Sequence, residues 1–135
     1  MHAAPAARRF WRDDRGGTMV EFALVAFLFL LILLGIGEFS LANWAKASVA
    51  DAAREGTRYA IVRGGQSGQA VGAAQIQTYV RSRSSLRPIT VTTVWTPNNL
   101  AGSTVAVTAA YAYRRVGLII PNRTLTSTSK MVIVY

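Results

Sequence analysis

The residue of this chain best placed to do chemistry is Glu21, a single carboxylate just before a long apolar run. The run from Phe22 to Gly37 contains no charged residue. An unpaired charge in hydrocarbon costs several kcal/mol, so a carboxylate at this place predicts a specific cationic partner. The alternative is that Glu21 lies at the membrane edge and its side chain reaches back to the headgroups.

Other residue types that carry catalysis are scarce. The one histidine, His2, precedes the apolar run, the sequence has no cysteine, and no Asp or Glu follows Glu55. The C-terminal half therefore lacks a general base and a set of metal ligands. The glycines between Gly64 and Gly72 are not followed by the Gly-Lys-Ser/Thr ending of a phosphate-binding loop. We expect no enzymatic activity, no metal site and no cofactor.

The apolar run has the length of a membrane-spanning helix. Residues 17–37 supply the roughly 20 residues that a helix needs to cross a bilayer. Basic residues dominate the leader before the run and favour the cytoplasmic side. We therefore expect a single pass through the inner (cytoplasmic) membrane, with the N-terminus inside and the residues after the run outside. A cleaved secretory signal peptide is the competing interpretation, but its apolar core usually has about 7 to 15 residues.

The helical pattern continues beyond the apolar run, through residues 39–63. This segment has no proline, one glycine and many alanines. Small residues recur at spacings of three or four and form one narrow face: Ala45, Val49, Ala52 and Gly56. Such a face suits close helix–helix packing in a bundle or filament. The spacings of Asp51 with Arg54 and of Glu55 with Arg58 predict intrahelical ion pairs.

The C-terminal half, residues 64–135, predicts a small α+β head. A glycine-rich turn precedes a short amphipathic helix that begins near Ala73 and ends before Pro88. Side-chain types then alternate with a period of two residues, which predicts three strands, over residues 89–95, 104–113 and 126–135. These elements favour a three-stranded antiparallel sheet packed against the helix, with part of the long helix as a second cover.

The predicted organisation thus has three parts. Residues 1–16 form a leader, residues 17–63 form one long helix whose N-terminal half spans the membrane, and residues 64–135 form the head. A helix that spans the membrane and continues into a small head is the expected α+β architecture.

The predicted head is uniformly basic. All six acidic residues lie at or before Glu55, and residues 56–135 carry only basic charges. The candidates for contact with an anionic partner are Arg81, Arg83, Arg87, Arg114, Arg115 and Arg123. Acidic protein surfaces, anionic lipid headgroups and polyanionic polymers all fit this charge. No nucleic-acid-binding motif is present, so no specific nucleic acid is predicted. The alternative is that the basic residues only keep a small head soluble.

An apolar segment, Val116–Pro121, lies between two predicted strands and is flanked by arginines. If it is exposed, it suits docking of a partner or of a membrane surface. If it folds over an open edge of the core, it is structural. The sequence leaves both interpretations open.

The start of the apolar run resembles the processing site of class III prepilin-like signals: a basic leader, a glycine, then a glutamate and an aromatic residue at the head of the helix. In this resemblance Gly16 precedes the cut, Gly17 is the new N-terminus, and Glu21 with Phe22 is the pair beyond it. A chain in a protease cleft is extended, and glycine resists helix formation there. The alternative is a plain turn at the two glycines.

This resemblance also implies two roles. The cut is made by a separate prepilin peptidase, so the chain is its substrate. Glu21 pairs with the freed N-terminal amine of a neighbouring subunit and thereby sets the register of assembly.

The block from Asp51 to Ala60 resembles the segment that follows the hydrophobic helix in TadE-like proteins. These are minor pilins or pseudopilins of tight-adherence (Tad, or Flp-type) type IV pilus systems. The main pilin of such systems is shorter and lacks a globular tail, so the length of this chain favours the minor component. The resemblance implies a type IV pilin-like fold and incorporation into a pilus through the N-terminal helix, in support of pilus assembly and cell adhesion.

The implied partners are other pilin subunits, an inner-membrane assembly platform, the prepilin peptidase and the membrane, with a final place in a cell-surface pilus. Two different functions stay open. One is a permanently anchored envelope module that recognises an acidic partner, and the second is a pseudopilin of a type II secretion system.

Overall fold

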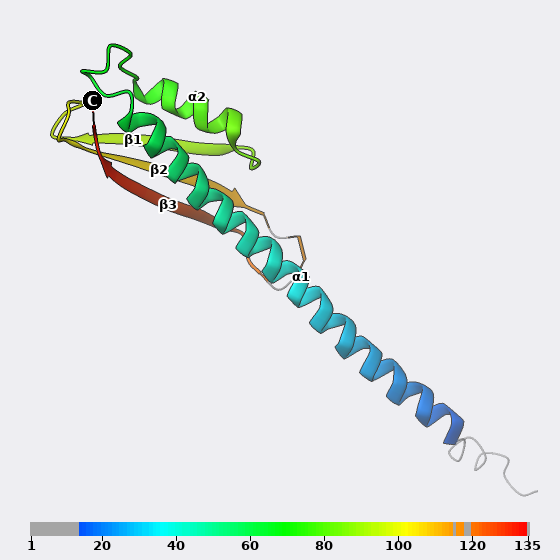
Figure 1. Cartoon of the computed structure of the whole chain (residues 1–135). Helices are drawn as coiled ribbons and strands as arrows, with labels where there is room; N and C mark the ends of the chain where they lie inside the picture. The colour runs from blue at the N-terminus through cyan, green and yellow to red at the C-terminus, as the bar shows by residue number, and fades with distance from the viewer. Residues whose placement is uncertain (1–13, 115, 118–119, 135) are drawn as a thin grey trace, which may run out of the picture. The chain divides into compact units, whose positions relative to one another are not determined.

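The computed structural model describes residues 14–114, 116–117 and 120–134 (Figure 1). Its elements in chain order are α1 (Asp14–Ile61), α2 (Ala73–Arg83), β1 (Ile89–Thr96), β2 (Thr104–Tyr113) and β3 (Arg123–Val132). A long apolar helix, a short helix and a three-stranded antiparallel sheet confirm the predicted α+β, pilin-like fold class. The chain divides into two compact units, Met1–Gly37 and Glu38–Tyr135.

The observed elements differ from the predicted ones mainly at their ends. The helix α1 begins at Asp14 and so includes both Gly16 and Gly17, and it ends at Ile61. The strand β3 begins at Arg123, three residues before the predicted start, because Arg123 pairs with Tyr113 and the ladder therefore runs to the end of β2. Strand ends are set by the partner strand, which the period-two pattern does not contain.

The first unit contains the apolar part of α1. Among the described residues, the chain has one helix that is long and apolar enough to cross a membrane. The large apolar side chains of this part are exposed, as Phe22 is to 74%. A continuous apolar surface of this kind is unfavourable in water but matches hydrocarbon. The helix fits a single-pass membrane protein.

The second unit is built on the sheet, in which the strand order is β1-β2-β3 and both pairings are antiparallel. Side chains alternate between its two faces, as the pleat requires. Val105, Val107 and Ala109 of β2 are fully buried on one face. The opposite face carries Thr92, Thr108 and Thr128 in one row across the sheet.

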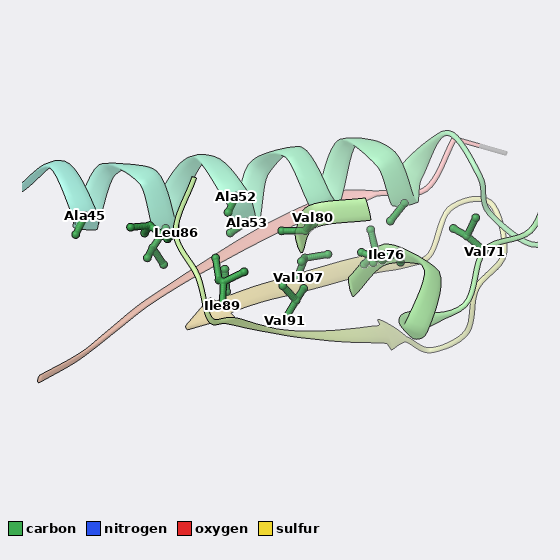
Figure 2. Packing of buried hydrophobic residues seen from close by; sticks show 14 of the residues in the cluster. Ala45, Ala52, Ala53, Val71, Ile76, Val80, Leu86, Ile89, Val91 and Val107 are labelled. Atoms are coloured by element: carbon green, nitrogen blue, oxygen red, sulfur yellow. The ribbon is translucent and has the colours of Figure 1, made fainter. Parts of the chain in front are cut away.

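The core of the second unit is formed by the buried sheet face, α2 and the C-terminal part of α1 (Figure 2). Ala45, Ala52 and Ala53 of α1 belong to the same cluster as Ile76 and Val80 of α2. Small residues let the helix backbone approach the sheet closely, so the long helix is a component of the core. The predicted second cover of the sheet is therefore present.

Candidate functional site

The predicted processing segment lies within the first turns of α1. Gly16 and Gly17 are helical, and a Cβ atom added at either would meet no atom within 4 Å. Each glycine within a helix is about 1 kcal/mol less favourable than alanine. The first turns of α1 therefore unwind more readily than the turns that follow. The two glycines are therefore helical in the uncleaved chain, but they stabilise the helix less than other residues would.

Glu21 and Phe22 follow on the exposed surface of α1. Gly17 and Glu21 are four residues apart, which places them on the same side of the helix, one turn from each other. Among the side chains that the structure describes, those of residues 16–114, 116–117 and 120–134, Glu21 has no hydrogen-bond or ion-pair partner. A cation for this carboxylate has to come from elsewhere than these residues.

The predicted helix-packing face is occupied by the head of the same chain. Ala45, Val49 and Ala52 are buried in the core of the second unit. Gly56 has the closest approach: a Cβ atom there would lie 2.8 Å from Cγ2 of Val80 and 2.9 Å from Cγ1 of Val107. The glycine is needed because α2 and β2 meet α1 at this point. A role of this face between subunits stays a prediction, and its small residues already have a role within the chain.

The two predicted ion pairs have different outcomes. Arg54 Nη1 lies 3.2 Å from Asp51 Oδ1, as the spacing predicts. Glu55 instead accepts a hydrogen bond of 2.7 Å from the hydroxyl of Tyr79, and among the described residues it forms no ion pair with Arg58. This hydrogen bond, followed by desolvation and by the charge of Glu55, raises the pKa of Tyr79 above its ordinary value of 10.0. A partner in α2 has thus displaced the local one.

An aromatic stack that the sequence analysis missed joins α1 to α2. The rings of Tyr59 and Tyr79 are nearly parallel, at 15°, with centroids 4.0 Å apart. The guanidinium of Arg63 lies 4.2 Å from the centroid of Tyr59, and that of Arg83 lies 5.5 Å from the centroid of Tyr79. Arginines therefore cover the outer ring faces, which favours a clasp between helices over a stacking platform for a ligand. The two tyrosines are 20 positions apart, so no local pattern relates them.

The remaining predicted basic residues gather at one end of the sheet. At this end β1 begins, β2 ends and β3 begins, because Ile89 pairs with Tyr111 and Tyr113 pairs with Arg123. Arg81 is tied there by a hydrogen bond of 3.1 Å from its Nε to the carbonyl oxygen of Ile89. The exposed side chains at this end are Arg81, Arg87, Arg114 and Arg123, and we call them the basic end of the head. Arg115 lies outside the described residues.

Gly117 and Ile120, from the segment Val116–Pro121, lie at the same end and contact α1 at Glu38. The side chain of Glu38 is only 7% exposed, and its Oε2 accepts a hydrogen bond of 3.0 Å from the backbone N–H of Ile120. A Cβ atom at Gly117 would overlap the carboxylate of Glu38.

The described residues of this segment divide between the two predicted interpretations. Ile120 packs against the core, whereas Val116 is 74% exposed. Leu118 and Ile119 lie outside the described residues. Glu38 itself had one signal in the sequence, a lone carboxylate directly after the apolar run.

A groove lies beside this contact, between α1 and the start of β3. Its volume is about 670 Å³. Its apolar lining comes from Phe39, Ala42, Val49, Ile120 and Leu125. Lys46 of α1 and Arg123 of β3 also line it, so we call it the Lys46 groove. Among the described residues, neither cation forms an ion pair with a carboxylate.

Comparisons with known proteins bear on the N-terminal part of the chain. A family model with the description TadE-like protein matches residues 16–58. The match begins at the glycine of the predicted cut, covers most of α1 and includes most of the block from Asp51 to Ala60. The search of curated proteins and the search of solved structures each returned no significant match.

Proposed function

The chain is TadE-like over residues 16–58, which associates it with Tad pilus systems, and we propose that it is a minor pilin or pseudopilin of such a system. In this proposal α1 carries the chain into the pilus, and the chain supports pilus assembly and surface adhesion. The observation that carries the proposal is the extent of the family match. It begins at Gly16 and follows α1, the element through which a subunit of this kind would be incorporated.

The first step is cleavage by a prepilin peptidase between Gly16 and Gly17, with the leader on the cytoplasmic side of the inner membrane. Two adjacent glycines support this step because a peptidase needs an extended chain and glycine lowers the cost of leaving the helix. The exposed position of both glycines, with no atom within 4 Å of a Cβ atom, also leaves them accessible.

The second step is assembly, in which Glu21 pairs with the amine of Gly17 on a neighbouring subunit. Two charges in hydrocarbon attract each other strongly enough to offset part of their desolvation only when they are in direct contact. This requirement makes the pair a determinant of register between subunits. The absence of a partner for Glu21 among the side chains of residues 16–114, 116–117 and 120–134 is consistent with a partner from another subunit.

The chain has no catalytic role in this proposal. Its single histidine is His2 and it has no cysteine. In the folded unit the carboxylate of Glu38 is buried against a loop, and those of Asp51 and Glu55 are engaged by Arg54 and Tyr79. The work of assembly falls to the membrane platform and its partners, while this chain contributes contacts.

The deciding experiment is the mass and N-terminal sequence of the protein recovered from its native membrane, together with a Gly16→Leu variant. Gly37→Leu is the matched control, because it makes the same change in the same helix away from the predicted cut. A start at Gly17 in the wild type and control, with Gly16→Leu left uncut, supports the proposal. An intact wild-type chain refutes it and favours a permanently anchored envelope module.

Two further readouts distinguish a Tad minor pilin from a secreted protein and from a type II secretion pseudopilin. Two small-residue sequences could serve as signal-peptidase sites, Ser40-Leu41-Ala42 and Ala45-Lys46-Ala47, so a start at Asn43 or Ser48 would indicate an ordinary secretory signal peptide. Deletion of the chain should reduce surface pili if it serves a Tad system, whereas loss of enzyme secretion with intact pili would indicate a type II secretion pseudopilin. Glu21→Gln should still be cut but should reduce the number of pili.

A further inference from the structure

We propose that the basic end of the head, together with the Lys46 groove and Val116, binds the surface of an anionic phospholipid bilayer. The proposal concerns the chain while it is anchored in a membrane and does not depend on its role in a pilus. Several kinds of anionic partner fit the charge of the head. The positions of the cations in the folded unit favour anionic lipid among them.

The first argument is position. Glu38 begins the folded unit, and a peptide bond joins it to Gly37, the last residue of the apolar run. The loop that contains Ile120 is held on Glu38 by a hydrogen bond of 3.0 Å. The basic end lies where this loop leaves β2 and enters β3. Arg114 and Arg123, which flank this loop, therefore lie at the end of the folded unit that contains Glu38, the residue joined to the apolar run.

The second argument is reach. From Glu38 to Lys46 is eight residues of helix, or about 12 Å along the axis. Side chains on a helix lean toward its N-terminus, so the long side chain of Lys46 extends back toward Glu38. The polar layer on each side of a bilayer is about 5 to 8 Å thick, because a core of about 30 Å becomes 40 to 45 Å with the headgroups. An ammonium at the end of Lys46 comes within range of this layer.

The third argument is chemistry. The Lys46 groove combines an apolar lining with two cations, which matches a phospholipid that has acyl chains beside a phosphate. Val116, in the loop between β2 and β3, is exposed, and moving its apolar side chain out of water is favourable in free energy. An acidic protein surface would satisfy the arginines but would leave Val116 and the apolar lining without a match.

The fourth argument is the placement of the acids. Glu38 is buried, and its carboxylate accepts a hydrogen bond from the loop that ends at β3. The carboxylates of Asp51 and Glu55 lie further along α1 and are engaged by Arg54 and Tyr79. Residues 89–132 contain no Asp or Glu, and no carboxylate lines the Lys46 groove.

The test uses the full chain in nanodiscs of phosphatidylcholine alone, or of phosphatidylcholine and phosphatidylglycerol in equal parts. The sequence contains no cysteine, so Val116→Cys provides a single site for a nitroxide label. The populations of lipid-shielded and water-exposed label, measured by electron paramagnetic resonance, give the ratio of docked to undocked heads. We expect the docked form to predominate only with phosphatidylglycerol, and to decrease as salt rises.

The decisive variant is Lys46→Gln with Arg123→Gln. Each cation near an anionic surface contributes about fivefold to binding, so the pair should lower the docked-to-undocked ratio about 25-fold. The matched control is Arg58→Gln with Lys130→Gln, which removes the same charge from exposed positions outside the groove. The control should change the ratio by about twofold or less. Circular dichroism of each variant checks that the head is folded.

Three results would overturn the proposal. One is a label that stays exposed to water in both kinds of nanodisc. Another is an equal response to both double variants, which would mean that only the total charge matters. The third is shielding that is independent of phosphatidylglycerol but rises with the number of chains per disc, which would assign this surface to a second copy of the chain.

Discussion

Gly56→Ala is a direct test of the contact between the long helix and the head. The added Cβ atom would lie 2.8 Å from Val80 Cγ2 and 2.9 Å from Val107 Cγ1, well inside van der Waals contact. The two valines belong to α2 and β2, so relieving one contact does not relieve the second. Both side chains are β-branched and have few alternative rotamers. The head must therefore move away from α1 at two places.

The magnitude follows from two opposing effects. Overpacking a core by one methyl group costs about 1 to 3 kcal/mol, and contact with two elements puts this site in the upper part of that range. Alanine gains about 1 kcal/mol over glycine in a helix. The net destabilisation is then about 1 to 2 kcal/mol. For a folded unit of this size, that lowers the melting temperature by about 5 to 15 °C.

The assay is thermal unfolding of the head, followed by near-ultraviolet circular dichroism on the full chain in detergent micelles. Gly37→Ala is the matched control, because its Cβ atom would meet nothing within 4 Å in the same helix. It should leave the transition unchanged. Gly56→Ala combined with Val80→Ala should be less destabilised than the sum of the single variants, by about 1 kcal/mol. A Gly56→Ala head that melts at or above the wild-type temperature would refute the reasoning.

Contacts elsewhere in the folded unit give three further predictions. The raised pKa of Tyr79 means that its hydrogen bond to Glu55 stabilises the fold below pH about 10 and is lost as pH rises through the folded value. The melting temperatures of wild type and Tyr79→Phe should therefore converge at alkaline pH, and parallel curves would contradict this. Thr57→Val removes a buried hydroxyl that donates to the carbonyl oxygen of Ala53 at 2.8 Å and to that of Ser129 at 3.3 Å. It should cost about 1 kcal/mol in the free energy of unfolding, whereas Thr57→Ser should cost less if the hydrogen bonds matter more than packing. Gly117→Ala should displace the carboxylate of Glu38 and speed hydrogen exchange at the amide of Ile120 by about fivefold, and unchanged exchange would show that the loop does not depend on this contact.

Local patterns in the sequence predicted most of the helices and strands. The long helix, the short helix and the three strands follow from periodicity, because each pattern repeats within one element and needs no distant partner. The resemblance to TadE-like proteins also rested on contiguous residues, from Gly16 to Phe22 and from Asp51 to Ala60. The family match over residues 16–58 confirms it. The element ends were less accurate, as β3 shows, because pairing with β2 decides where that strand begins.

Tertiary packing determines which residues contact each other. A face of small residues from Ala45 to Gly56 predicts close packing in general, and the fold places the sheet of the same chain against it. Glu55 had a suitable partner one turn away in Arg58, but α2 brings the hydroxyl of Tyr79 within 2.7 Å of its carboxylate. Glu55 and Tyr79 are 24 positions apart, so their contact produces no periodic pattern in the sequence of either helix.

The same division holds for charge and function. The apolar run of membrane-spanning length and the basic C-terminal half, with no Asp, Glu, His or Cys after Glu55, can be read from the sequence, because length, composition and net charge are the same in any conformation. Arg87, Arg114 and Arg123 lie at one end because of the antiparallel register of the sheet, and Arg81 joins them through its hydrogen bond to Ile89. Glu38 is buried because the loop closes over it. The physical reason is that the direction and neighbours of a side chain are fixed when distant segments pack. A linear pattern of charge does not contain that information.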